Sequence, residues 1–166
     1  MFFNKLIPII LSLSIIQSIP PKDPLDTDPS KPLGDVVPIE ASVSQFENTN
    51  KQKILLPKYI PFTPTHTGGH YNELLKMLSI QYLDQKANNL LAISVYLKKN
   101  RSKNFEVKSE NVTLADGTIA MYVHSEDHGA DIIRFKKNNL TYQIRLSKRG
   151  TEKKLDDLIK VANSLQ

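Results

Sequence analysis

The chain has 166 residues, of which 40% are hydrophobic and 23% are charged, with a formal net charge of +5 and no cysteine. This composition is typical of one globular domain with some additional length, and it excludes a disordered or fibrous chain. The lack of cysteine excludes disulfides, thiolate metal ligands and anchoring as a lipoprotein, so the fold depends on its hydrophobic core.

The first eighteen residues have the pattern of a secretory signal peptide. Lys5 precedes an apolar run at 6–16, which is shorter than the roughly 20 apolar residues of a membrane-spanning helix. We therefore expect 1–18 to be a signal peptide, and the remainder to be secreted or associated with the cell envelope. Ile16 and Ser18 fit the small-residue cleavage rule only loosely, so a retained signal that anchors the chain is the alternative.

Proline and acidic residues dominate the next segment. Residues 19–50 contain two lysines against six acidic residues, a net charge of −4, and show no sustained hydrophobic period. We expect an acidic, disordered linker there, because proline at this density disfavours both helix and sheet. Residues 51–166 contain nineteen basic against eleven acidic residues, a net charge of +8, and are expected to form the exported domain.

Segments with alternating apolar and polar residues predict a β-sheet in this domain. Six of them occur in chain order, at 78–82, 91–97, 105–114, 118–125, 131–137 and 140–146. Asp116-Gly117 and Asn138-Asn139 are typical of tight hairpin turns, and the polar stretch DQKANN joins the first two strands. Tyr59 and Phe62 in the segment PKYIPFTP at 57–64 are expected to pack against the sheet, and the alternative is an extended arm across the sheet edge, because the prolines exclude a central strand.

The last sixteen residues change to a helical period. Apolar side chains recur three and four positions apart, at Leu155, Leu158, Ile159, Ala162 and Leu165. Thr151 is in position to cap a helix over 151–165. An amphipathic helix needs an apolar surface to cover, and the sheet supplies one. The expected fold class is therefore α+β, with an about six-stranded antiparallel sheet in consecutive hairpins and the C-terminal helix packed on one face.

Several motifs, in this order, resemble a bacterial family. They are LPKYIPF at 56–62, VTLADGTIAMYV at 112–123, IIRF at 132–135, LTYQIRL at 140–146 and LIKVANSL at 158–165. Together they resemble a bacterial domain of unknown function, found at the exported C-terminal end of anti-sigma-factor-like and sporulation-associated proteins of Gram-positive bacteria. The resemblance covers about 54–166 and implies an exported sensing or interaction domain, without an established enzymatic activity. Members commonly have tryptophan where Phe135 stands.

The four histidines occur in two pairs of equal spacing, HTGGH at 66–70 and HSEDH at 124–128. On a helix, two imidazoles four residues apart lie close enough to share a zinc ion. Gly68-Gly69 in the first pair and Gly129 after the second disfavour a helix, however. Along a strand four residues span about 13 Å, too far for one metal at zinc–nitrogen distances of about 2.0 Å.

A metal site would need ligands that the loops bring together. If the strands run up and down in order, both histidine pairs lie at the same end of the sheet, with about 14 Å between them. Beside His124 and His128, oxygen ligands would come from Glu126, Asp127 and Asp131. We interpret the histidines as residues of solvated turns, and expect no metal and no other cofactor.

Sequence signatures of catalysis are largely missing. The chain has no Gly-x-Ser-x-Gly elbow, no phosphate-binding glycine loop, no His-Glu-x-x-His motif and no cysteine nucleophile. A triad of Ser125, His128 and Asp131 stays open, because triads are defined by geometry, although a polar turn has the same composition. We expect no catalytic residue and no enzyme.

The sequence therefore favours a non-enzymatic binding or sensing domain at the bacterial cell envelope. The cations of 51–166 suit an anionic lipid or wall polymer, with an envelope protein as a further candidate and no nucleic acid, although lysines also solubilise edge strands. No later apolar run reaches membrane-spanning length, so the chain is not expected to span a membrane after signal removal. The alternative is a metal-dependent or hydrolytic envelope enzyme that uses the loop from His124 to Asp131.

Overall fold

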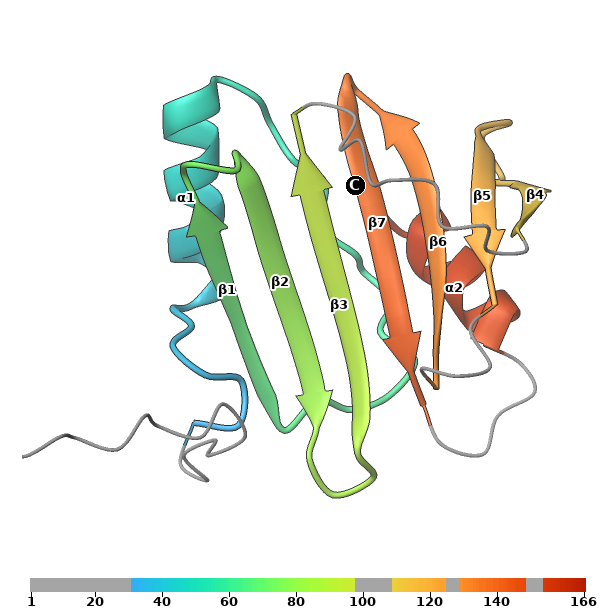
Figure 1. Cartoon of the computed structure of the whole chain (residues 1–166), viewed down its shortest axis with the longest axis horizontal. Helices are drawn as coiled ribbons and strands as arrows, with labels where there is room; N and C mark the ends of the chain where they lie inside the picture. Colours follow the sequence, from blue (N-terminus) through green and yellow to red (C-terminus); the bar gives the residue numbers. More distant parts are fainter. Residues whose placement is uncertain (1–30, 98–108, 125–128, 149–153) are drawn as a thin grey trace, which may run out of the picture.

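The computed structural model describes residues 31–97, 109–124, 129–148 and 154–166. These residues form a seven-stranded antiparallel sheet with two helices, both of which lie behind the sheet in the view of Figure 1. The predicted α+β class and the C-terminal helix on the sheet are confirmed, and the sheet has one strand more than the six expected. The predicted signal peptide at 1–18 lies outside the described residues.

The elements in chain order are α1 (Ile39–Asn50), β1 (His66–Asn72), β2 (Met77–Asp84), β3 (Asn89–Tyr96), β4 (Ser109–Thr113), β5 (Ile119–Val123), β6 (Ala130–Lys137), β7 (Leu140–Ser147) and α2 (Lys154–Asn163). The strands lie side by side in the order β1-β2-β3-β7-β6-β5-β4. Consecutive strands pair as hairpins within β1–β3 and within β4–β7, and β3 meets β7 at the centre. The sheet therefore consists of two antiparallel units, β1–β3 and β4–β7, that are joined by the pairing of β3 with β7. The strands do not follow one another across the sheet in chain order.

The turns that the sequence marks are confirmed. Asn138 and Asn139 have φ of 50° and 61°, the left-handed pair that a two-residue hairpin needs, and asparagine tolerates this conformation well. In the β4–β5 turn, Gly117 has φ of 82° and the Asp116 carboxylate accepts a hydrogen bond from the Thr118 N–H at 3.0 Å. Local turn chemistry thus determines these two hairpins.

The prediction of a disordered linker is wrong for its last twelve residues, which form α1. Ile39, Ser42 and Phe46 are buried and lie three and four positions apart, so they share one face of the helix. Pro38 occupies the N-cap position, where an N–H would have no partner within the helix. The helix ends at Lys51, which has a left-handed backbone conformation and donates its N–H to the Glu47 carbonyl. The prolines lie before the helix and not within it.

The first histidine motif also differs from expectation, because HTGGH begins strand β1 and is not a turn. Its two glycines allow neighbouring segments to approach the backbone closely. A side chain at Gly68 would collide with Val36, and one at Gly69 would collide with Ser42 of α1. The backbone of Gly69 also exchanges two hydrogen bonds with Val37, at 2.8 and 2.9 Å. Because Gly68 and Gly69 have no side chains, the segment at Val36 and helix α1 can pack directly against the edge strand β1.

The arm at 57–64 does not lie at the sheet edge. The segment that contains it runs behind the sheet, between the two helices (Figure 1). Just before the arm, the Leu55 N–H donates to the Tyr142 hydroxyl at 2.9 Å, and Leu56 exchanges two backbone hydrogen bonds with Gln166. The arm therefore belongs to the helical layer, where it connects β7 with the end of α2.

One hydrophobic core lies between the sheet and the helical layer. Its fully buried members include Phe46 of α1, Leu158 of α2 and the central row Ile80, Ile93, Ile144 and Ile133. The predicted helical face of α2 is confirmed, although Thr151 lies outside the described residues. Among the residues described, no helix has the length and apolar character needed to cross a membrane.

Candidate functional site

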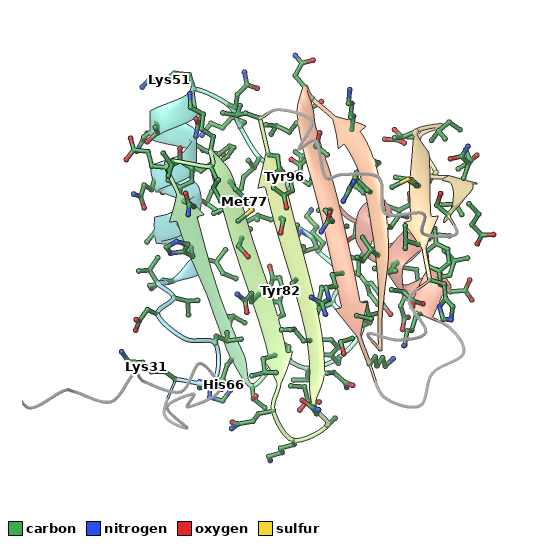
Figure 2. The ribbon with its side chains drawn as sticks, viewed as in Figure 1. Lys31, Lys51, His66, Met77, Tyr82 and Tyr96 are labelled. Carbon is green, nitrogen blue, oxygen red and sulfur yellow. The ribbon has the colours of Figure 1, made fainter. Side chains whose placement is uncertain are left out.

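The strand register divides the sheet into a covered face and an open face. Residues that pair across strands point to the same side, so the isoleucine row of the core and the row beside it face opposite ways. That second row contains Ser79, Ser94, Gln143 and Arg134, which follow one another across β2, β3, β7 and β6. Both described helices lie on the other side of the sheet, so this side faces the viewer in Figure 2.

We call the side away from the helices the open face. Its side chains are His66, His70 and Asn72 of β1; Met77, Ser79, Gln81 and Leu83 of β2; Leu90, Ala92, Ser94 and Tyr96 of β3; Thr141, Gln143, Arg145 and Ser147 of β7; Ala130, Ile132, Arg134 and Lys136 of β6; Ile119, Met121 and Val123 of β5; and Ser109, Asn111 and Thr113 of β4. Among these described residues there is no aspartate or glutamate.

Three cations lie along the two neighbouring strands β6 and β7 of the open face. Arg134 and Lys136 come from β6, and Arg145 comes from the adjacent β7. Arg134 pairs with Gln143 and Arg145 with Ile132, so the two arginines are diagonal neighbours about 7–8 Å apart. The Arg134 guanidinium donates from Nε and Nη2 to the Gln143 side-chain oxygen, which fixes its direction.

The acidic residues of the described strands point the other way. Asp84, Glu110 and Asp131 all have the orientation of the covered face. Among the described strand residues, the open face therefore carries basic side chains and no acidic ones, which favours a positive potential. Hydroxyl and amide groups surround the cations, so the surface offers hydrogen bonds as well as charge.

Asp131 forms the second polar arrangement. Its side chain is 3% exposed, and its two oxygens accept hydrogen bonds from the Tyr122 hydroxyl at 2.7 Å and from His124 Nδ1 at 2.9 Å. A carboxylate only accepts, so Nδ1 carries the proton and Nε2 remains available on a half-exposed imidazole. Burial, the hydrogen bond to Asp131 and the Asp131 charge raise the pKa of Tyr122 well above 10.0.

Such a carboxylate–imidazole pair orients histidine in hydrolases and in metal sites. The other members of the predicted triad and metal site, Ser125, Glu126, Asp127 and His128, lie outside the described residues. Within the part of the chain that the structure describes, no three side chains of histidine, aspartate or glutamate come together as metal ligands. The triad and the loop metal site therefore stay predictions.

The structure separates the histidines that it describes. His66 and His70 lie on one strand, four residues apart, and His124 follows β5. His66 and His124 occupy the same end of the sheet, as the sequence analysis anticipated, but five strand spacings, about 24 Å, lie between β1 and β5. The larger separation arises because β1 and β4 are the edges of the sheet, so His66 and His124 share no metal ion.

Sequence analysis did not single out the arginines of the open face. The alternation in DIIRFKK and LTYQIRL already places Arg134, Lys136 and Arg145 opposite the apolar side chains. The Asn138-Asn139 turn already makes β6 and β7 neighbours, so the missing information was that β3 pairs with the other side of β7 and places this hairpin inside the sheet. Comparison of the chain with protein-family models, with curated proteins and with solved structures found no match.

Proposed function

We propose that this chain is a non-enzymatic binding domain of the bacterial cell envelope, and that its open face holds an anionic wall polymer. The observation that carries the proposal is that the described strands place three basic side chains, Arg134, Lys136 and Arg145, and no acidic side chain on the open face. A partner with repeated negative charges would be attracted by these cations, and would meet no acidic side chain among the described strand residues of that face.

The chemistry of the face favours phosphate or carboxylate groups on an extended chain. Arginine binds both groups through paired hydrogen bonds, and Arg145 is exposed on the surface. Serine, glutamine and tyrosine side chains beside the arginines match the hydroxyl groups of a polyol or sugar. A seven-stranded sheet is about 29 Å wide, which suits several units of a polymer better than one small molecule.

The proposal agrees with the bacterial family that the sequence resembles, whose members are exported sensing or interaction domains. Export through a signal peptide at 1–18 is part of the proposal. It places the open face outside the cytoplasmic membrane, where anionic wall polymers occur.

A binding titration of the whole chain against poly(glycerol phosphate), with neutral dextran as the comparison polymer, tests the proposal. Binding to the phosphate polymer alone is expected, with an affinity that falls as salt rises, because exposed charges are screened. The double variant R134Q/R145Q is expected to bind at least about tenfold more weakly, since hydrogen bonds to charged groups are strong.

The matched control is K86Q/K160Q, which removes the same net charge from the β2–β3 turn and from α2. If both double variants lost the same affinity for the phosphate polymer, the loss would be due to net charge alone, and the proposal would be contradicted. Equal binding to dextran, or an affinity independent of salt, would contradict it as well.

A hydrolytic function is the second candidate. The hydrogen bond between His124 Nδ1 and Asp131 favours this function, because the Nε2 atom of His124 is then available to accept a proton. Hydrolysis of a chromogenic ester or phosphodiester that is lost in both H124A and D131N would support this function. Activity that persists in both variants would exclude His124 as the base.

A further inference from the structure

The β1–β2 hairpin presents two leucines to solvent at its tip. Leu74 is 92% exposed and Leu75 is 62% exposed, the highest values among the large hydrophobic side chains described. The two side chains take no part in the core cluster. Turn positions usually carry glycine, asparagine, aspartate or proline, so the turn itself does not call for leucine.

The hairpin tip holds these leucines in a defined position. The Leu75 N–H donates to the Asn72 side-chain oxygen at 2.9 Å, and the Lys76 N–H donates to the Glu73 carbonyl at 3.2 Å. Lys76 completes the turn with φ of 48°. With the backbone fixed in this way, the leucines project from the end of the sheet and do not fold back onto it.

Two lysines lie at the same end of the molecule as the tip. The end of α1 lies against the end of β1, because the Asn50 side chain donates to the Tyr71 hydroxyl at 2.9 Å. Lys51 follows Asn50 at this end of the molecule (Figure 2), and Lys76 belongs to the hairpin itself. Both lysines are exposed.

The acidic groups at this end have less influence than the cations. Glu47 forms an ion pair with Lys53, whose side chain is 89% exposed. Partial burial would raise the pKa of Glu47, but hydrogen bonds from Lys53 and from the Ile54 N–H outweigh it and hold that pKa below its usual value. Glu73 is the acid of the hairpin tip. Among the described residues near the tip, Lys51, Lys53 and Lys76 therefore outnumber Glu47 and Glu73, and Glu47 is paired with Lys53.

We propose that Leu74 and Leu75 insert into the surface of an anionic lipid bilayer while Lys51, Lys53 and Lys76 contact its headgroups. Two side chains offer far less area than the roughly 1,200 Å² of a stable protein–protein interface. Shallow insertion into a bilayer needs only a few apolar side chains with cations around them. This contact uses the end of the sheet and leaves the open face available, so it does not depend on the proposed polymer binding.

The test uses the lack of tryptophan in the chain. In the whole chain, L75W places a single tryptophan at the tip and leaves Leu74 in place. Vesicles of phosphatidylglycerol with phosphatidylcholine should shift its emission to the blue, and brominated acyl chains should quench it. The matched control, A87W, places the tryptophan in the exposed β2–β3 turn at the opposite end of the sheet, where no change is expected.

Each alternative has a distinct signature. An unchanged L75W emission overturns the proposal, as does an equal shift with phosphatidylcholine alone or an equal shift in A87W. A blue-shifted emission without lipid, together with a dimer in sedimentation, would assign the tip to a second copy of the chain and overturn lipid insertion. Because the reporter is local, attachment of the vesicles through another part of the chain does not mimic the expected result.

Two double variants separate the apolar from the electrostatic contribution. L74S/L75S should reduce the fraction of chain bound to anionic vesicles by about tenfold or more, since each leucine loses its apolar contact. K51E/K76E should also reduce it, and the control K86E/K160E should reduce it less. Unchanged binding in L74S/L75S, with an unchanged melting temperature, would overturn the proposal.

Discussion

Ser42 of α1 lies directly on Gly69 of β1, with no space between them for a side chain. A Cβ built on Gly69 would lie 2.9 Å from the Ser42 Cβ and would overlap its Oγ. The Ser42 hydroxyl is occupied in the helix, where it donates to the Ile39 carbonyl at 2.8 Å. A helix can therefore rest on the edge strand only because this strand position has no side chain.

The first prediction follows from this contact. Gly69→Ala should destabilise the fold by about 1–3 kcal/mol, the usual range for overpacking, as measured by urea denaturation. Thr67→Ala, an exposed change on the same strand, should stay within about 0.5 kcal/mol. The double variant S42A/G69A should recover part of the loss. A Gly69→Ala variant as stable as the original chain would contradict the close contact.

The second prediction concerns α1 as part of the domain. Phe46 is 0% exposed and packs edge to face on Tyr71, with ring centroids 5.5 Å apart. Phe46→Ala should cost about 3–5 kcal/mol of unfolding free energy, whereas the exposed Gln45→Ala should have little effect. If both variants melt at the same temperature as the original chain, α1 does not contribute to the core.

The third prediction concerns the buried carboxylate of Asp131. Tyr122→Phe removes one of its two hydrogen-bond donors and should cost about 1.5–3 kcal/mol at neutral pH. Because the pKa of Tyr122 is raised in the folded state, this contribution is complete below 10.0 and decreases as the pH rises further. Stability curves of the two proteins should therefore approach each other above about pH 10. A gap that widens there would contradict the assignment.

The fourth prediction concerns acid conditions. Hydrogen bonds from Thr118, together with the ion pair to Lys137 at 3.0 Å, lower the pKa of Asp116 from 3.8 to about 2. Its contribution to stability is present above pH 3.8 and is lost as the pH falls toward about 2. Asp116→Asn should therefore be less stable than the original chain at neutral pH, and the difference should disappear near pH 2. Thermal melts across this range measure it, and a constant difference would refute the shift.

Local patterns in the sequence were enough to predict most of the elements. Alternation located six of the seven strands, and the turn residues Gly117 and Asn138 adopt the backbone that their chemistry favours. The period of α2 identified its buried face, including Leu158. In each case the information lies within one element or one turn.

Two of the three misses arise from contact between distant segments, and the third arises from local composition. Strand β1 contains Gly68 and Gly69, residues that disfavour a strand unless another segment needs to approach its backbone. Helix α1 was overlooked because the prolines before it dominated the composition of 19–50. The pairing of β3 with β7 joins segments that are far apart in the chain, so no local pattern could place the β6–β7 hairpin, and with it Arg134 and Arg145, inside the sheet.

The pairing of β3 with β7 also determines when the sheet can be completed. Ile93 of β3 has Ile144 of β7 as its partner, with the whole β4–β6 unit between them in the chain. Such non-local pairing raises the contact order and slows folding. Until β7 has formed, the inner edge of β3 exposes unsatisfied hydrogen-bonding groups beside apolar side chains, the kind of edge that recruits other chains. We therefore expect refolding yield to fall as protein concentration rises, even though this edge is sealed in the native sheet.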